Sequence, residues 1–168
     1  MFFSRSTFLS VALLGFISGG AAPALAHELA LNAVTVEIAG KSVAAYALNG
    51  KVLYTFEKDL RAKGSTCSGV CAEFWPPILL TDQEVRELVS HGGEVEVYAA
   101  DGTESHKEGF SVIARGQGKH ARMQLAFNGW PLYHYVFDRS ETDAYGDEHN
   151  PGGVDAWYTF TADFKDHD

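Results

Sequence analysis

NGKVLYTFEKD at residues 49–59 and NGWPLYHYVFD at residues 128–138 are near copies of each other. Aligned without a gap, both contain Asn-Gly, then Leu-Tyr, an aromatic residue two places on and a final Asp, at an offset of 128 − 49 = 79 residues. Asn-Gly readily adopts positive φ and closes tight turns between strands. Large side chains alternate after each turn, and this period of two is typical of a β-strand.

Each copy therefore predicts a β-hairpin, and we expect the two hairpins to face each other across a pseudo-twofold axis within one domain. The alternative is that Asn-Gly-x-x-Leu-Tyr is only a common way to begin a strand. Both copies also end on Asp, and this agreement favours an internal repeat over coincidence.

The two copies carry the pattern Tyr-x-(Phe/Trp/Tyr)-x-x-Asp, first as Tyr54, Phe56 and Asp59 and then as Tyr133, Tyr135 and Asp138. Further motifs follow in order: Cys67-x-x-x-Cys71-Ala-x-x-Trp75-Pro-Pro, Gly109-Phe-Ser-Val-Ile, and Gly146-Asp ahead of Trp157. Between residues 49 and 160 the sequence thus resembles a bacterial family of secreted proteins and predicted lipoproteins named after the Tyr…Asp motif. The function of that family is unknown, so the resemblance implies a location more than an activity.

The remaining pattern predicts a mainly β fold. Alternating residues predict strands at 33–38, 42–48, 51–56, 94–99, 109–114, 124–127 and 154–160. One clear helix begins at Thr81-Asp82-Gln83-Glu84, where Thr81 or Asp82 can cap it, and ends at His91-Gly92-Gly93. We therefore expect a single antiparallel β domain with an internal pseudo-twofold repeat and one helix near 82–91.

Residues 1–26 have the features of a secretory signal peptide: Arg5, an apolar run, and Ala24-Leu25-Ala26 as a cleavage site. Cleavage between Ala26 and His27 leaves residues 27–168 as one domain. No cysteine lies near the site, so we expect no lipid anchor, although the resembled family includes lipoproteins. No other stretch is long and apolar enough to span a membrane. The expected location is the periplasm or the external medium.

The charge balance excludes nucleic-acid binding. The chain has 13 Lys and Arg, 22 Asp and Glu and a net charge of −9, and losing Arg5 with the signal peptide brings this to −10. Such a surface repels nucleic acids and anionic membranes, and no basic stripe interrupts it.

Cys67 and Cys71 are the two cysteines of the chain. In an exported protein a close pair predicts a disulfide, and residues four apart on a helical turn lie within the reach of one. Such a bond would fix the turn that leads to Trp75. The alternative is a redox or copper pair, because thiolates suit soft metals; the oxidising compartment favours the disulfide.

Familiar catalytic motifs are missing from the sequence: no Gly-x-Ser-x-Gly, no His-Glu-x-x-His and no phosphate loop. Asp59 and Asp138 each follow a strand, where a carboxylate commonly accepts the backbone N–H groups of the next turn. We expect this structural role rather than catalysis, and we expect the motif aromatics to pack in a sheet.

The sequence leaves the cofactor unknown, and copper is the one candidate that it offers. Cleavage would make His27 the amino terminus, where the free amine and the imidazole chelate Cu²⁺. A second candidate group is His120, Met123 and His134, with His149 as an outer member; it mixes imidazole with thioether, as copper sites do. The alternative is that neither set of residues forms a metal site. Histidines that lie on separate faces of the protein would favour this alternative.

Together these patterns predict a non-enzymatic extracytoplasmic protein that binds a small ligand or a cell-envelope partner. The alternative is a periplasmic protein that binds copper or takes part in electron transfer. An enzyme such as a hydrolase is the third hypothesis.

Overall fold

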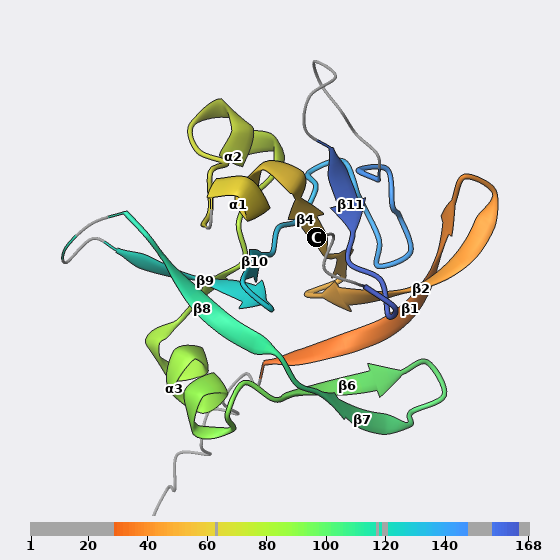
Figure 1. Cartoon of the computed structure of the whole chain (residues 1–168). Coiled ribbons are helices and arrows are strands. Elements are labelled where there is room, and N and C mark those ends of the chain that lie inside the picture. Colours follow the sequence, from red (N-terminus) through yellow and green to blue (C-terminus); the bar gives the residue numbers. More distant parts are fainter. Residues whose placement is uncertain (1–28, 63, 117, 119–120, 148–155, 165–168) are drawn as a thin grey trace, which may run out of the picture.

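The computed structural model describes residues 29–62, 64–116, 118, 121–147 and 156–164 (Figure 1). They form a mainly β fold, as the sequence predicts. The strands are β1 (Ala30–Ile38), β2 (Lys41–Leu48), β3 (Lys51–Val52), β4 (Tyr54–Phe56), β5 (Leu79–Leu80), β6 (Val95–Ala99), β7 (Glu104–Lys107), β8 (Phe110–Arg115), β9 (Arg122–Phe127), β10 (Trp130–Pro131) and β11 (Trp157–Thr159). The helices are α1 (Glu57–Ala62), α2 (Val70–Phe74) and α3 (Asp82–Ser90).

The strands belong to three sheets. The largest has the order β3-β2-β1-β6-β7, the second has the order β10-β9-β5 with β8 also paired to β9, and β11 pairs with β4. Within the described residues the pairings are antiparallel except that of β1 with β6, which is parallel. The antiparallel prediction therefore holds for most of the fold.

Both Asn-Gly turns form as the sequence predicts. Asn49 and Gly50 have φ of 53° and 77° between β2 and β3, and Asn128 and Gly129 have φ of 48° and 84° between β9 and β10. The strand after each turn is shorter than expected, because the chain changes partner. After β3 the chain enters β4, which pairs with β11, and beyond β10 Tyr133 forms isolated bridges.

The helix predicted near 82–91 is α3. Thr81 accepts a hydrogen bond from the backbone of Glu84, whose carboxylate accepts one from the Thr81 backbone, so the two residues form a capping box. The sequence did not predict α1 or α2. A helix of 6 residues is too short to show a helical period, and α1 begins at Glu57, directly after the strand expected at 51–56.

Two apolar clusters fill the interior. The larger includes Leu31, Leu53, Leu125, Leu132 and Phe160, all fully buried, and it joins the two main sheets. The smaller is built from the motif aromatics and Cys67. It lies beneath α1 and α2, which are neighbours at one end of the molecule, while α3 lies at the opposite end beside β8 (Figure 1).

Candidate functional site

The two motif copies exchange their buried polar groups, and we call this arrangement the crossed Tyr–Asp pairs. Tyr54 Oη donates to Asp138 over 2.6 Å, and Tyr133 Oη donates to Asp59 over 2.5 Å. The backbones are joined as well, since each of Tyr54 and Tyr133 donates its N–H to the carbonyl of the other, over 2.9 and 3.0 Å. Each copy therefore supplies the phenol for the other copy's carboxylate.

Both motif copies also share a backbone hydrogen bond to their aspartate, at equivalent positions 79 residues apart. Asp59 accepts the backbone N–H of Thr66 over 2.7 Å, and Asp138 accepts that of Tyr145 over 3.1 Å, with 66 + 79 = 145. These are the backbone bonds that the sequence predicts for the two carboxylates. A pseudo-twofold axis relating complete halves stays a prediction, which these paired contacts support.

Four aromatic rings stack in a column beside the crossed pairs. Phe56 stacks on Trp157 with centroids 4.1 Å apart, Trp157 on Trp75 at 3.9 Å, and Trp75 on Tyr135 at 4.2 Å. The outer rings come from equivalent positions of the two copies, because 56 + 79 = 135. All the motif aromatics are thus engaged with one another in the core.

Burial sets the protonation of the crossed pairs. It raises the pKa of Asp138 to about 6, against the lowering effect of the bonds from Tyr54 and Tyr145, and it raises the pKa of Asp59. Burial and the neighbouring carboxylates also raise the pKa of Tyr54 and Tyr133. Asp59 and Asp138 are each 1% exposed and already hydrogen-bonded, so neither carboxylate is open to solvent in this structure.

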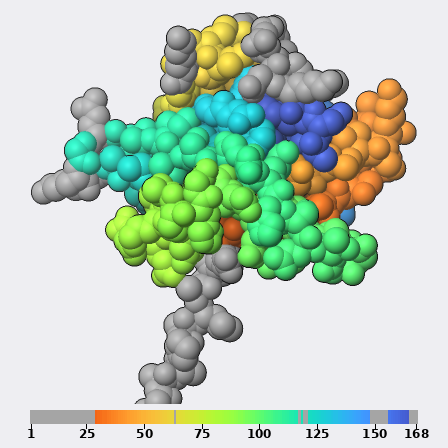
Figure 2. All heavy atoms as spheres, turned by 60° about the horizontal axis from the view of Figure 1, so that its bottom comes forward, coloured from red at the N-terminus to blue at the C-terminus, as the bar shows by residue number. Residues whose placement is uncertain are grey.

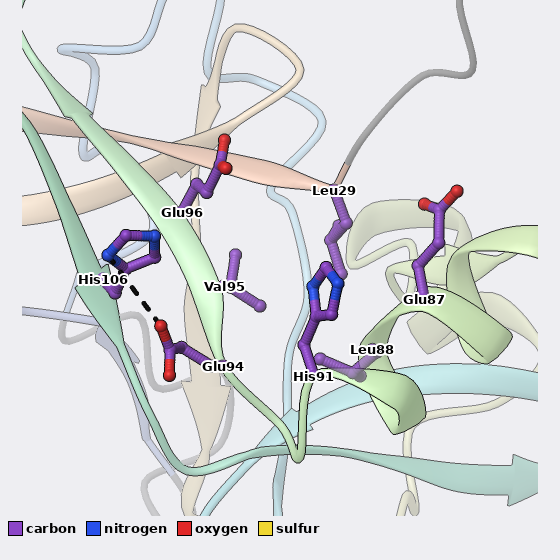
Figure 3. Close-up of a pocket in the computed structure, with 8 residues that line it drawn as sticks. All are labelled: Leu29, Glu87, Leu88, His91, Glu94, Val95, Glu96 and His106. Atoms are coloured by element: carbon purple, nitrogen blue, oxygen red, sulfur yellow. Dashed lines mark ion pairs between the residues drawn. The ribbon is translucent and has the colours of Figure 1, made fainter.

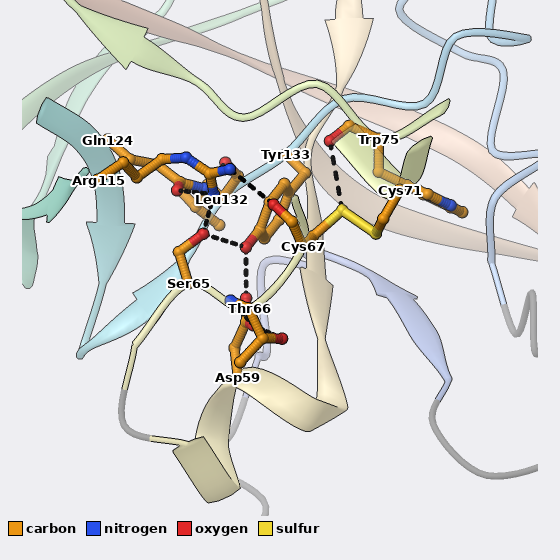
Figure 4. The surroundings of a disulfide bond; sticks show 10 residues. All are labelled: Asp59, Ser65, Thr66, Cys67, Cys71, Trp75, Arg115, Gln124, Leu132 and Tyr133. Atoms are coloured by element: carbon orange, nitrogen blue, oxygen red, sulfur yellow. Dashed lines mark hydrogen bonds between the residues drawn. A yellow bond between two sulfur atoms is a disulfide. The ribbon is translucent and has the colours of Figure 1, made fainter. Parts of the chain in front are cut away.

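Cys67 and Cys71 form the disulfide that the sequence predicts, with Cα atoms 5.3 Å apart (Figure 4). The bond closes the turn before α2 and leads directly to Trp75, whose backbone N–H donates to the Cys71 carbonyl over 2.8 Å. Bonded sulfur atoms offer no thiolate, so the alternative of a copper pair at these cysteines does not apply to this state.

The sequence gives no signal for Arg115, which ties the disulfide turn to β9. Its guanidinium donates to the Cys67 carbonyl over 2.6 Å, to Gln124 Oε1 over 3.0 Å and to Ser65 (Figure 4). Fully buried Gln124 in turn donates to the Leu132 carbonyl over 2.8 Å. These partners lie far apart in the chain, so only the tertiary structure brings them together.

The predicted copper residues remain untested as a group. His27, His120 and His149 lie outside the described residues. Met123 lies in β9, in the wall of a cavity of about 300 Å³ whose lining does not include His134. His134 is partly buried; its Nε2 is shielded and has no hydrogen-bond partner, and burial lowers its pKa to about 4.

A cavity of about 340 Å³ lies between α3 and the β6–β7 hairpin (Figure 3). The space-filling view shows these two elements side by side, with the beginning of β1 visible between them (Figure 2). The cavity has an apolar floor and a polar rim. Its lining residues are Leu29, Glu87, Leu88, His91, Glu94, Val95, Glu96 and His106.

The rim of this cavity adjoins a group of potential metal ligands that the sequence did not single out. Glu96, Glu104 and His106 each offer a ligand atom, and these atoms lie within 4.8 Å of one another. No other group of three His, Cys, Asp or Glu side chains meets this condition in the described part of the chain. The alternation of residues 94–99 and the Asp101-Gly102 turn were the signals that could have revealed it.

One of three comparisons with known proteins found a match. Residues 39–78 match the model of a family described as a secreted repeat of unknown function, which confirms the resemblance inferred from the sequence. Neither the curated proteins nor the solved structures gave a match. No helix that the structure describes has the length and apolar character needed to span a membrane.

Proposed function

From the match of residues 39–78 to a secreted-repeat family, we propose that this is a non-enzymatic protein that binds a partner protein of the cell envelope. In this proposal the signal peptide is removed between Ala26 and His27, and residues 27–168 act in the periplasm or outside the cell. The observation that carries the proposal is an exposed aromatic patch on a rigid support.

The patch consists of Val70, Phe74, Val136 and Phe137. Their side chains are 67%, 44%, 36% and 54% exposed, respectively. Val70 and Phe74 lie four residues apart in α2 and so share one helical face. The rings of Phe74 and Phe137 have centroids 6.2 Å apart, and the Val136 N–H donates to the Phe74 carbonyl over 3.0 Å. Adjoining exposed apolar side chains mark surfaces that other proteins cover.

The support beneath this patch is held in place by covalent and aromatic contacts. The disulfide of Cys67 and Cys71 fixes the start of α2. Phe137 packs edge-on against Tyr135, with centroids 5.3 Å apart, and Tyr135 belongs to the stacked ring column. A surface that is already ordered loses little conformational entropy on binding, and aromatic side chains dominate binding energies at such surfaces.

A partner protein explains the patch better than a small ligand does, because the four side chains project outward and the described cavities lie elsewhere. An enzymatic role receives no support from the crossed Tyr–Asp pairs, since their acids are buried and bonded to each other's tyrosines. Copper binding through His27 or through His120, Met123 and His134 stays the second prediction of the sequence, and no described contact favours it.

The proposal can be tested by placing a photo-crosslinking amino acid at Phe137 in the exported protein. We expect irradiation of intact cells to give an adduct of defined mass with an envelope protein. The same amino acid at Val89, which is 67% exposed on α3, is the matched control and should give no such adduct. Phe74→Ser should abolish the adduct at position 137.

The partner recovered from that adduct is then purified and titrated against the protein. Phe74→Ser should weaken binding tenfold or more, whereas a Val89→Ser control should not change it. Equal crosslinking at positions 89 and 137, or a Phe74→Ser variant that binds like the original protein, would contradict the proposal.

A further inference from the structure

We propose that Glu96, Glu104 and His106 form a binding site for a divalent transition-metal ion, Zn²⁺ or Cu²⁺, on the outer face of the β6–β7 hairpin. The register of the hairpin places Glu96 directly opposite His106, and Glu104 opposite Tyr98. Side chains two residues apart in a strand share a face, so Glu104 lies beside His106. Val95 and Val97 point to the opposite, buried face.

The spacing of the ligand atoms suits a single ion after a small movement. Zn²⁺ binds imidazole nitrogen and carboxylate oxygen at about 2.0–2.2 Å, so two ligands of one ion lie at most about 4.4 Å apart. The ligand atoms of the trio lie within 4.8 Å of one another. Glu104 and His106 are exposed, and their side chains can turn toward partly buried Glu96 without disturbing the core.

A hydrogen bond orients one of the three ligands, and a carboxylate lies close to a second. Tyr98 Oη donates to one oxygen of Glu96 over 2.6 Å, which leaves the other oxygen for an ion. The carboxylate of Glu94 lies 3.8 Å from Nδ1 of His106, which leaves Nε2 for an ion (Figure 3). Hydrogen-bonded outer partners such as Tyr98 are typical of metal-binding side chains, because they fix the ligand in one direction. Glu94 lies beyond hydrogen-bond distance from His106 and supplies negative charge there rather than a fixed orientation.

The local charge favours a cation. Glu87, Glu94 and Glu96 all line the same cavity, and within the described residues none of them forms an ion pair with a lysine or arginine. Lys107 lies next to His106 in the chain, but its Nζ lies over the rings of Tyr46 and Phe127 on the other face. One carboxylate oxygen of Glu87 is shielded and without a hydrogen-bond partner.

The donor set selects the class of metal. Imidazole with carboxylates suits Zn²⁺ and Cu²⁺, whereas Ca²⁺ and Mg²⁺ prefer oxygen ligands alone and Cu⁺ prefers sulfur. Three protein ligands leave coordination positions for water, and the adjoining cavity of about 340 Å³ provides room for it. The site lies on the β6–β7 hairpin rather than on α2, so it is independent of the partner-binding patch.

The test is a calorimetric titration of ZnCl₂, and separately of CuSO₄, into the metal-free exported protein with its natural amino terminus. We expect one equivalent of either ion to bind, with Cu²⁺ held more tightly than Zn²⁺, as at most sites of nitrogen and oxygen ligands. His106→Gln and Glu104→Gln should each weaken binding tenfold or more. The control is His91→Gln, an exposed histidine that lines the same cavity outside the trio, and it should change the affinity less than twofold.

A chain with Gly-Ser-Gly-Ser inserted before His27 separates this site from a chelate at the amino terminus, because the imidazole then lies too far along the chain from the free amine to share one ion with it. Binding that survives the insertion supports the trio. Binding that the insertion removes, or that His106→Gln leaves unchanged, overturns the proposal. Failure of both ions to bind at about 100 μM overturns it as well. All the substituted side chains are exposed, and circular dichroism of each variant verifies that the fold is intact.

Discussion

Tyr133 donates its phenol hydrogen to Asp59 over 2.5 Å, although the two residues lie 74 positions apart in the chain. Asp59 is 1% exposed and Tyr133 is fully buried, so neither group can bond to water instead. The carboxylate also accepts the Thr66 backbone N–H and hydroxyl. One buried carboxylate thus joins the first motif copy, the second motif copy and the chain that leads to the disulfide.

Tyr133→Phe should lower the free energy of unfolding by about 1–3 kcal/mol, because it leaves a buried carboxylate oxygen without this donor while the ring still packs. Urea denaturation followed by tryptophan fluorescence measures the change. Tyr145→Phe is the matched control: that side chain is 68% exposed, and its replacement should alter stability by less than about 0.5 kcal/mol. Equal effects of the two variants would show that the buried bond does not stabilise the fold.

Gly146→Ala should also destabilise the protein, for a steric reason. A Cβ at position 146 would lie 2.5 and 2.8 Å from ring atoms of Trp75 and 3.0 Å from Tyr54, inside the stacked column. Overpacking of this kind costs about 1–3 kcal/mol. Gly64→Ala is the control, since a Cβ there meets nothing within 4 Å. Thermal unfolding and the near-ultraviolet circular dichroism of the tryptophans measure both effects.

The elements that the sequence predicts are those determined by neighbours in the chain. The Asn-Gly turns, the capped helix α3 and the disulfide each depend on residues within a few positions of one another. The bonds from the following backbone to Asp59 and Asp138 span seven residues and belong to the same class. Local propensity and turn chemistry are sufficient for such features.

The crossed Tyr–Asp pairs and the anchoring of Arg115 could not be predicted in the same way. They depend on which strands become neighbours, and β4 leaves its hairpin to pair with β11. The metal-ligand trio is an intermediate case. The Asp101-Gly102 turn is visible in the sequence, but counting residues outward from this pair places Val97 opposite His106. The observed register places Glu96 there, so the turn alone does not establish it.

Asp138 should make stability depend on pH. Burial raises its pKa from an ordinary 3.8 to about 6 in the folded protein. The folded state therefore holds the proton more tightly than the unfolded state does, so the resulting stabilisation is complete below pH 3.8 and is lost as the pH rises through about 6. The difference is on the order of 3 kcal/mol. Asp138→Asn should remove this contribution, and urea denaturation at pH 4 and pH 7 measures it.

His134 should make stability depend on pH in the opposite direction, over nearly the same pH range as Asp138. Burial, and then the charge of nearby Lys51, lower its pKa from 6.5 to about 4. The stabilisation from the neutral ring is complete above pH 6.5 and is lost as the pH falls through about 4, again on the order of 3 kcal/mol. Between pH 7 and pH 4 the contributions of His134 and Asp138 should therefore largely cancel.

Single variants separate the two pH-dependent contributions that cancel in the original protein. On going from pH 7 to pH 4, His134→Gln should gain stability relative to the original protein and Asp138→Asn should lose it, while the double variant should return close to the original difference. His91→Gln, at an exposed histidine, is the control and should leave the difference unchanged. Parallel pH profiles for both single variants would show that neither burial shifts a pKa enough to matter for stability. Opposite slopes of similar size would show that the two buried groups balance each other.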